Sequence, residues 1–167
     1  MKKKGFTLVE LITVITVMII LVAVGFITLD PYKAVKLDAA AKKVAMDLRY
    51  AQNLALSTVK WLGISFEADP LNTYTVYQTD GMIDSVIENP SELGKDFIVD
   101  LFDYFGGVKI SNVNFGGGNK IEFNPLGVPY DDKNGSTLTE EAVVALSYRG
   151  LAKEIRITPN TGRVYIQ

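Results

Sequence analysis

The chain has 167 residues, with 17 basic and 19 acidic side chains, no histidine and no cysteine. This composition excludes cysteine-based zinc or iron–sulfur sites, disulfides, and catalytic triads or proton shuttles that need histidine. The near balance of charge also argues against a chain that is basic throughout and binds nucleic acid. We therefore expect one domain without a cofactor, long enough to bury a hydrophobic core.

A long apolar segment follows a short basic stretch at the start of the chain. The segment runs from Phe6 to Leu29 and is preceded by three lysines, Lys2–Lys4. At about 1.5 Å per helical residue, it is long enough to cross a hydrocarbon core of about 30 Å. Lysines on its N-terminal side predict a cytoplasmic N-terminus and an exported remainder. The sequence thus predicts a transmembrane half-helix over residues 6–29.

One carboxylate, Glu10, lies inside this apolar segment. An ionised carboxylate in lipid costs several kcal/mol unless it is paired. A secretory signal peptide does not fit, because the apolar core is too long and no small-residue cleavage site follows it. A plain membrane anchor fits the length and charge but gives no reason for Glu10. The simplest alternative is that Glu10 reaches the headgroup layer, about one helical turn into the segment.

The stretch "KGFTLVE" resembles the leader of type IV prepilins, in which a basic leader ends in Gly before Phe-Thr-Leu-x-Glu. The resemblance implies that a prepilin peptidase cleaves between Gly5 and Phe6 and methylates the new amine of Phe6. Glu10 corresponds to the family's glutamate at the fifth mature position. It would then pair with the Phe6 amine of a neighbouring filament subunit.

The residue types at these positions agree with that processing. Gly5 has no side chain, so a protease can approach the bond that follows it closely. Cleavage creates an α-amine at Phe6, and Glu10 lies four residues further along the same helical face. The carboxylate could therefore meet an amine within one chain or across two chains.

A second helix is predicted over residues 30–60, with Asp30 as its cap and Pro31 in its first turn. Charged side chains, Asp47 among them, lie mostly off its apolar stripe. The stretch "DLRYAQNLALS" resembles the minor pseudopilin H family of type II secretion, which is related to minor pilins of type IV pili. The stripe that we expect to face a sheet consists of Leu37, Ala41, Val44, Leu48, Ala51, Ala55 and Val59.

After this helix, apolar residues recur at every second position, and this alternation predicts strands. Residues 62–67 and 73–79 form a predicted hairpin, and residues 80–107 stay unassigned. Further strands are expected at 108–115, 120–124, 142–149, 153–158 and 163–166, separated by turns rich in Gly and Asn. These elements indicate an α+β protein whose exported head, residues 61–167, is antiparallel β-sheet packed on the helix. The resemblance implies a pilin-like fold.

Three weaker sites can be proposed in the head. Loop oxygens of Asp131, Asp132 and Asn134 could hold calcium, although a solvated turn explains them more simply. A locally basic C-terminal hairpin could contact nucleic acid, but Tyr165 occupies the position of a second arginine in the DNA-binding minor pilins that it resembles. Paired carboxylates could serve a hydrolase. The basic residues are Arg149, Lys153, Arg156 and Arg163, and the carboxylates are Glu140, Glu141, Asp100 and Asp103.

The resemblance implies a minor pseudopilin of type II secretion, a structural subunit and not an enzyme. Its alternative is a minor pilin of a type IV pilus that primes assembly or serves DNA uptake. A membrane-anchored hydrolase is a remote third candidate. The implied partners are a prepilin peptidase, other pilins or pseudopilins and an inner-membrane assembly platform. Residues 1–5 would be the leader, and the head would lie in the periplasm before assembly into a filament.

Overall fold

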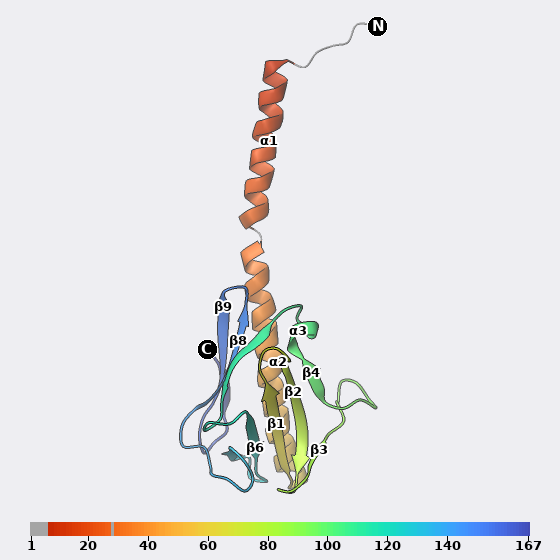
Figure 1. The fold of residues 1–167 in the computed structure, drawn as a ribbon, viewed down its shortest axis with the longest axis vertical. Helices are drawn as coiled ribbons and strands as arrows, with labels where there is room; N and C mark the ends of the chain where they lie inside the picture. Colours follow the sequence, from red (N-terminus) through yellow and green to blue (C-terminus); the bar gives the residue numbers. More distant parts are fainter. Residues whose placement is uncertain (1–6, 28) are drawn as a thin grey trace. The chain divides into compact units, whose positions relative to one another are not determined.

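A computed structural model of the chain describes residues 7–27 and 29–167 (Figure 1). The chain divides into two compact units, Met1–Val35 and Lys36–Gln167, which are treated separately below. We call the second unit the head from here on, and it includes residues 36–60 as well as the predicted head, residues 61–167. The predicted cleavage and methylation positions, Gly5 and Phe6, lie outside the described residues.

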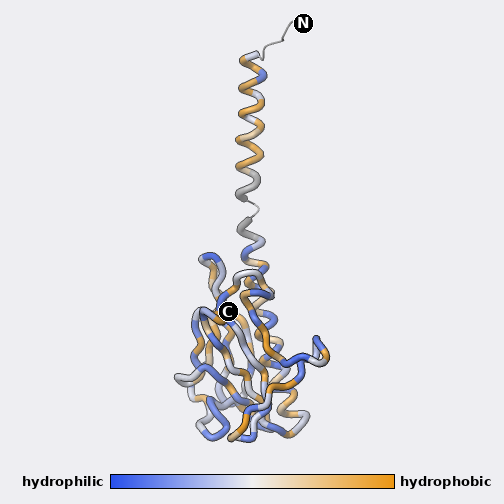
Figure 2. Tube along the Cα trace, turned by 45° about the vertical axis from the view of Figure 1, so that its right-hand side comes forward, coloured by the Kyte–Doolittle hydropathy of each residue, from blue (hydrophilic) through white to orange (hydrophobic). Residues whose placement is uncertain are grey.

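The first unit contains helix α1, Leu8–Ile27. Hydrophobic residues dominate its sequence, as the coloured part of the helix in Figure 2 shows. Its two central threonines satisfy their own hydroxyl groups, because Thr13 donates to the carbonyl of Val9 (2.7 Å) and Thr16 to that of Ile12 (2.8 Å). The polar groups of these two side chains are therefore already paired within the helix.

None of the helices in the described part of the chain has the length and hydropathy expected of a membrane span. The predicted segment 6–29 includes Phe6 and Thr28, which lie outside that part, and its insertion in a membrane stays a prediction.

Helix α2, Leu29–Thr58, crosses the border between the two units and supplies the helical wall of the head. Its buried face confirms the predicted stripe except at Val59, which is 73% exposed. The stripe fails there because the helix ends at Thr58 and Val59 has a left-handed backbone (φ 56°), which turns the chain away. The buried residues are Leu37, Ala40, Ala41, Val44, Ala45, Leu48, Ala51 and Ala55.

The first sheet is built on the predicted hairpin of β1 (Trp61–Glu67) and β2 (Thr73–Thr79), which pair in antiparallel register. On its other edge β1 pairs with β6, Lys120–Phe123, and β6 pairs with the short β7, Pro129–Tyr130. Two three-residue strands, β3 (Asp84–Val86) and β4 (Ile98–Asp100), share the free edge of β2. The strand order is β3-β2-β1-β6-β7.

The second sheet contains four antiparallel strands in the order β10-β9-β8-β5. Its central hairpin closes through the two-residue turn Arg149–Gly150, whose φ values of 46° and 85° suit this tight connection. The strands are β5 (Lys109–Asn114), β8 (Ala142–Tyr148), β9 (Leu151–Ile157) and β10 (Val164–Ile166).

The predicted turn between β5 and β6 forms, but it joins the two sheets. The N–H of Phe115 donates to the carbonyl of Gly118 (3.2 Å), while β5 pairs with β8 and β6 pairs with β1. Two strands that are neighbours in sequence are therefore not neighbours in a sheet.

The segment left unassigned, residues 80–107, contains three short elements. They are β3 (Asp84–Val86), β4 (Ile98–Asp100) and the one-turn helix α3 (Leu101–Tyr104). The stretch "FIVDLFDYF" is thus strand first and helix second. Asp100 marks the change, because its side chain accepts the N–H of Asp103 (3.0 Å) and caps α3.

The α2 face and the inward faces of both sheets form one core. Its largest side chains are aromatic, and Phe66 is central among them, with ring centroids 5.5 Å from both Tyr74 and Phe115. The alanines of α2 allow the strands to approach the helix closely. The expected α+β fold, an N-terminal helix packed on antiparallel sheet, is confirmed (Figure 1).

Candidate functional site

The start of α1 is organised by Thr7, the residue before the helix. Its side-chain oxygen lies 3.3 Å from the N–H of Glu10, and its carbonyl accepts the N–H of Leu11 (3.1 Å). Thr7 and Glu10 therefore have the spacing of a capping box, and Glu10 lies in the first turn. A carboxylate in that turn is also stabilised by the positive end of the helix dipole. The position of Glu10 is thus favourable within its own helix, independently of any contact with another molecule.

The predicted roles of the other N-terminal residues are not tested by these contacts. Gly5 and Phe6 lie outside the described residues, so cleavage, methylation and a contact between Glu10 and the Phe6 amine stay predictions. Glu10 itself is exposed, as are the neighbouring side chains of α1. Its carboxylate is therefore accessible to a group from outside the helix.

A buried polar cluster, which we did not predict, joins α2 to the first sheet. Asp47 is 6% exposed and receives two hydrogen bonds from Lys43 (2.7 and 2.9 Å). The hydroxyl of Tyr74 donates to the same carboxylate. Burial, followed by the negative charge of Asp47, raises the pKa of Tyr74 well above its usual value. The cluster fixes the helix against strand β2 through a fully paired charge.

A second buried carboxylate, Glu122 on β6, fastens the other side of the first sheet. It is 1% exposed and accepts hydrogen bonds from Tyr77 (2.8 Å), from the backbone N–H of Lys133 (2.5 Å) and from Lys120 (3.3 Å). Burial and the Glu122 carboxylate raise the pKa of Tyr77. Partial burial acts to lower the pKa of Lys120. The carboxylates of Asp132 and Glu122 have the larger combined effect, so the pKa of Lys120 is raised above its usual value.

The candidate calcium ligands are engaged with other partners. Asp131 accepts the N–H groups of Asp132 (2.8 Å) and Ser136 (2.7 Å), and Asp132 forms a salt bridge with Lys120. The amide of Asn134 donates to the carbonyl of Gly81 (2.7 Å). Within the described residues, no group of three or more carboxylates is placed to hold a metal ion. These side chains build a turn that is fastened to the loop after β2.

The candidate basic hairpin is largely neutralised by acidic side chains from elsewhere in the fold. Arg156 pairs with Glu154 (2.6 Å) and Glu141 (3.1 Å), and Lys153 pairs with Asp38 on α2. Hydrogen bonds from Lys153 and Lys42 lower the pKa of Asp38 to about 2. Asp38 and Glu141 therefore oppose the positive charge of this hairpin together with Glu154, which lies in the hairpin itself.

The other two basic candidates do not extend this group into a patch. Arg149 lies in the β8–β9 turn with its guanidinium 5.5 Å from the ring centre of Tyr148. Arg163 lies in the exposed connection before β10. Phosphate contacts need unpaired positive charges gathered on one surface, and only these two candidates lack a carboxylate partner among the described residues.

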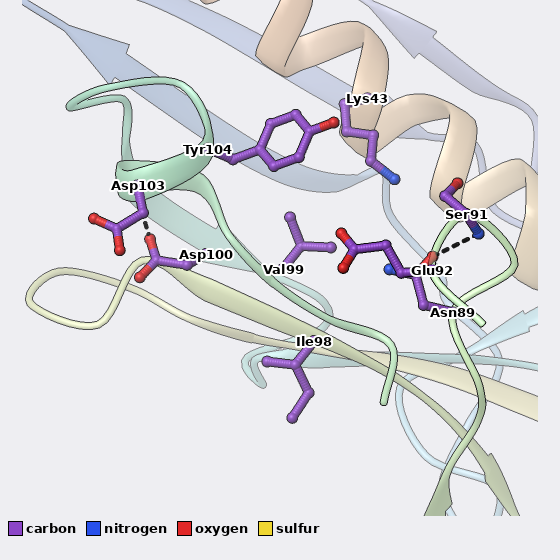
Figure 3. A pocket seen from close by; sticks show the side chains of 9 residues that line it. All are labelled: Lys43, Asn89, Ser91, Glu92, Ile98, Val99, Asp100, Asp103 and Tyr104. Carbon is purple, nitrogen blue, oxygen red and sulfur yellow. Dashed lines mark hydrogen bonds between the residues drawn. The ribbon is translucent and has the colours of Figure 1, made fainter. Parts of the chain in front are cut away.

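A pocket of about 300 Å³ lies between α2 and the segment of β4 and α3 (Figure 3). Asp100, Asp103 and Glu92 line it together with Lys43 and Tyr104. The carboxylate of Asp100 caps α3, and a hydrogen bond from Lys95 lowers the pKa of Glu92. A hydrolase of this kind needs a carboxyl group with a raised pKa as general acid. Glu92 has the opposite shift, so it does not fit that role.

The remaining carboxylate pair, Glu140 and Glu141, does not form a unit. Glu141 accepts a hydrogen bond from Tyr165 (2.6 Å) and another from Arg156 (3.1 Å). These two donors lower the pKa of Glu141. Glu141 thus binds side chains of β9 and β10 on the surface of the second sheet.

Comparisons with known proteins agree with the N-terminal features. Residues 1–26 match the model of the prokaryotic N-terminal methylation motif. The comparison with curated proteins found no match.

Two crystal forms of the type IV minor pilin FimU from Pseudomonas aeruginosa are similar in structure, with 16% sequence identity and a TM-score of 0.49. The alignments cover 78% of this chain and 87% or 92% of theirs. A likeness of that size carries no conclusion about function. The match to the methylation motif agrees with the resemblance of the N-terminal residues to type IV prepilins.

Proposed function

We propose that the chain is a non-catalytic structural subunit of a type IV pilus or a closely related filament, comparable to a minor pilin. The observation that carries this proposal is the N-terminal methylation motif over residues 1–26. A pseudopilin of type II secretion would share the motif, and no contact in the head favours secretion over a pilus. The proposal therefore covers minor pilins and related filament subunits, the pseudopilin of type II secretion among them.

The described part of α1 supports a role in packing against apolar surroundings. Its large side chains are exposed from Leu8 to Val22, and its central threonines are paired internally. Such a surface is stable only in lipid or against other apolar helices. We propose that residues 6–29 anchor the subunit in the inner membrane, with Lys2–Lys4 cytoplasmic and the head periplasmic, before the helix enters a filament.

The partners follow from that route. We propose that a prepilin peptidase removes residues 1–5 and methylates Phe6. Other pilin subunits and an inner-membrane assembly platform then take up the processed chain. Glu10, exposed in the first turn of α1, is the proposed contact for the Phe6 amine of the next subunit.

Replacing Gly5 with valine is expected to leave the leader attached. A branched side chain at this position obstructs the close approach of protease backbone that glycine permits. Mass spectrometry of the chain produced together with a prepilin peptidase measures the result, because cleavage removes residues 1–5. The natural chain must be shortened in the same experiment. An uncleaved natural chain would refute the proposed function.

Replacing Glu10 with valine is expected to leave cleavage intact and to reduce incorporation into filaments at least tenfold. Valine removes the charge that would pair with an amine in a medium of low dielectric constant. Sheared filaments can be assayed for the subunit by immunoblot, with Thr13→Val as the control in the same helix. Equal incorporation of Glu10→Val and the natural subunit would rule out the pairing.

A further inference from the structure

The β8–β9 hairpin runs alongside α2, and its turn points toward the residue where the chain enters the head. Lys153 on β9 forms a salt bridge with Asp38. Tyr148, which lies nearer the turn, has its hydroxyl 3.5 Å from the ammonium of Lys36, the first residue of the head. Moving along the hairpin toward its turn therefore means moving back along α2. Figure 1 shows the turn at this end of the head, which we call the entry end.

The turn exposes a short surface that is both basic and apolar. Residues 149–152 read Arg-Gly-Leu-Ala, and all four are exposed. A Cβ added to Gly150 would meet no atom within 4 Å, so the turn projects into open space. A single exposed leucine is ordinary on a protein surface. Here Leu151 lies two positions from Arg149, a cation with no carboxylate partner among the described residues, and the turn itself contains no acidic side chain.

The place of the turn in the head limits what it can contact. The proposed anchor ends at residue 29, and even a fully extended chain from there to Lys36 spans at most about 25 Å. The entry end therefore stays near any membrane that holds the anchor. The opposite end of the head is marked by Leu56 of α2, whose side chain lies against Gly127. The helix between Lys36 and Leu56 is about 30 Å long, so that end lies much further from the anchor.

We propose that the β8–β9 turn is a membrane-contact site, which rests on the phospholipid surface of the membrane that holds the anchor. The inference rests on the proposed function, because the anchor supplies that membrane. Leu151 would enter the boundary between headgroups and acyl chains, where the apolar side chains of interfacial segments lie. Arg149 would bind a headgroup phosphate through two parallel hydrogen bonds. Asp38 does not oppose this contact, because Lys42 and Lys153 neutralise it.

This surface suits a lipid partner better than a nucleic acid. One cation does not provide the group of charges that a phosphate backbone requires. Beside an exposed leucine, however, one arginine adds attraction to an anionic lipid surface. The contact would hold the entry end of the head against the membrane until the subunit is taken into a filament.

The test places a fluorophore beside the two contact residues without replacing them. The chain has no cysteine, so Ala152→Cys creates a single labelling site next to Leu151. Leu126→Cys is the matched control, because Leu126 is 78% exposed and precedes Gly127 at the opposite end. Each full chain, labelled with nitrobenzoxadiazole, is reconstituted in vesicles of phosphatidylcholine with or without phosphatidylglycerol. Quenching by lipids that carry a spin label in the headgroup region measures the contact.

Two substitutions in the Ala152→Cys chain separate charge from apolar contact. Arg149→Asn removes the charge, and asparagine tolerates the left-handed backbone of this position (φ 46°). Leu151→Ser removes the apolar side chain. Urea unfolding of both variants checks that the head remains folded.

In vesicles with phosphatidylglycerol, we expect at least about fivefold stronger quenching at residue 152 than at residue 126, because only the turn reaches the lipid surface. Arg149→Asn should lower the quenching at residue 152 by up to about fivefold, the effect of one basic residue near an anionic surface. Leu151→Ser should lower it in both lipid mixtures.

Equal quenching at residues 152 and 126 would overturn the inference, as would quenching at residue 152 that neither substitution lowers. A label at residue 152 that is shielded from the lipid quencher only at high ratios of protein to lipid would place a second copy on the turn, and would also overturn it. If the natural chain failed to float with the vesicles after an alkaline wash, the anchoring in the proposed function would be refuted instead.

Discussion

Replacing Asp47 with alanine is expected to lower the free energy of unfolding of the head by about 3 kcal/mol, the lower end of the range for breaking a buried ion pair. The variant leaves the ammonium of Lys43 and the hydroxyl of Tyr74 without their shared acceptor. Tyr74 is 1% exposed, so water cannot replace the lost bond there. The side chain of Lys43 is 20% exposed and can turn partly toward solvent, which keeps the effect from being larger.

Urea unfolding of the full chain in detergent, followed by the fluorescence of its single tryptophan, measures this change. Trp61 lies at the start of β1 and reports on the head. Asp38→Ala is the matched control, because Asp38 also lies on α2 and pairs with Lys42 and Lys153 at the surface. Exposed pairs contribute little, so its effect should be much smaller. A result in which both variants are equally stable would contradict the importance of burial at Asp47.

A double-mutant cycle separates the tyrosine bond from the lysine bond. Tyr74→Phe alone removes the donor while Lys43 still neutralises Asp47. Because the two side chains contact each other, we expect the loss in Asp47→Ala/Tyr74→Phe to be less than the sum of the single losses. Additive losses would show that Tyr74 and Asp47 act independently.

Replacing Gly63 with alanine is expected to destabilise the head by about 3 kcal/mol, at the upper end for inserting a methyl group into a packed site. An added Cβ would lie 2.5 Å from the ring of Tyr77 on the neighbouring strand. The ring cannot move aside at no cost, because its hydroxyl donates to the buried Glu122. The substitution therefore forces either a distorted β1–β2 pair or the loss of that hydrogen bond.

Gly118→Ala is the control for this second variant. The nearest atom to an added Cβ there is the carbonyl oxygen of Phe115, 3.9 Å away, and its φ is not left-handed. The same urea titration should show little change for Gly118→Ala. If Gly63→Ala were equally benign, the packing of Tyr77 over β1 would be looser than these contacts indicate.

Elements whose signals are local were predicted well from the sequence. The alternation in β1 and β2 and the 3–4 spacing on α2 both arise from each element burying one face, and the structure confirms them. The N-terminal motif could likewise be recognised from the sequence, because its residues are contiguous. Thr7 was not recognised as a cap, although the Thr-x-x-Glu spacing in "TLVE" was a visible signal.

Elements that depend on distant partners were missed. Asp47 lies three residues after Val44 and four before Ala51, a spacing that places it on the buried face of the helix. Its charge argued against burial, so the sequence did not predict it there. Tyr74 and Lys43 reverse that argument by pairing with it. Strands β3 and β4 have three residues each, which is too few to show an alternation of apolar and polar residues.

The pairing of β1 with β6 has a consequence for how the head is made. Its partners, such as Ser65 and Lys120, are far apart in the chain, whereas β1 and β2 meet through a short turn. The β1–β2 hairpin can therefore form while one edge of β1 is still unpaired, and that edge is covered only when β6 pairs with it. Pairing between segments so far apart in the chain slows folding. An unpaired edge is a template for aggregation. Because residues 61–79 are synthesised before residues 120–123, the hairpin would be vulnerable to aggregation until the later strand has been made, and chaperone protection would matter most in that interval.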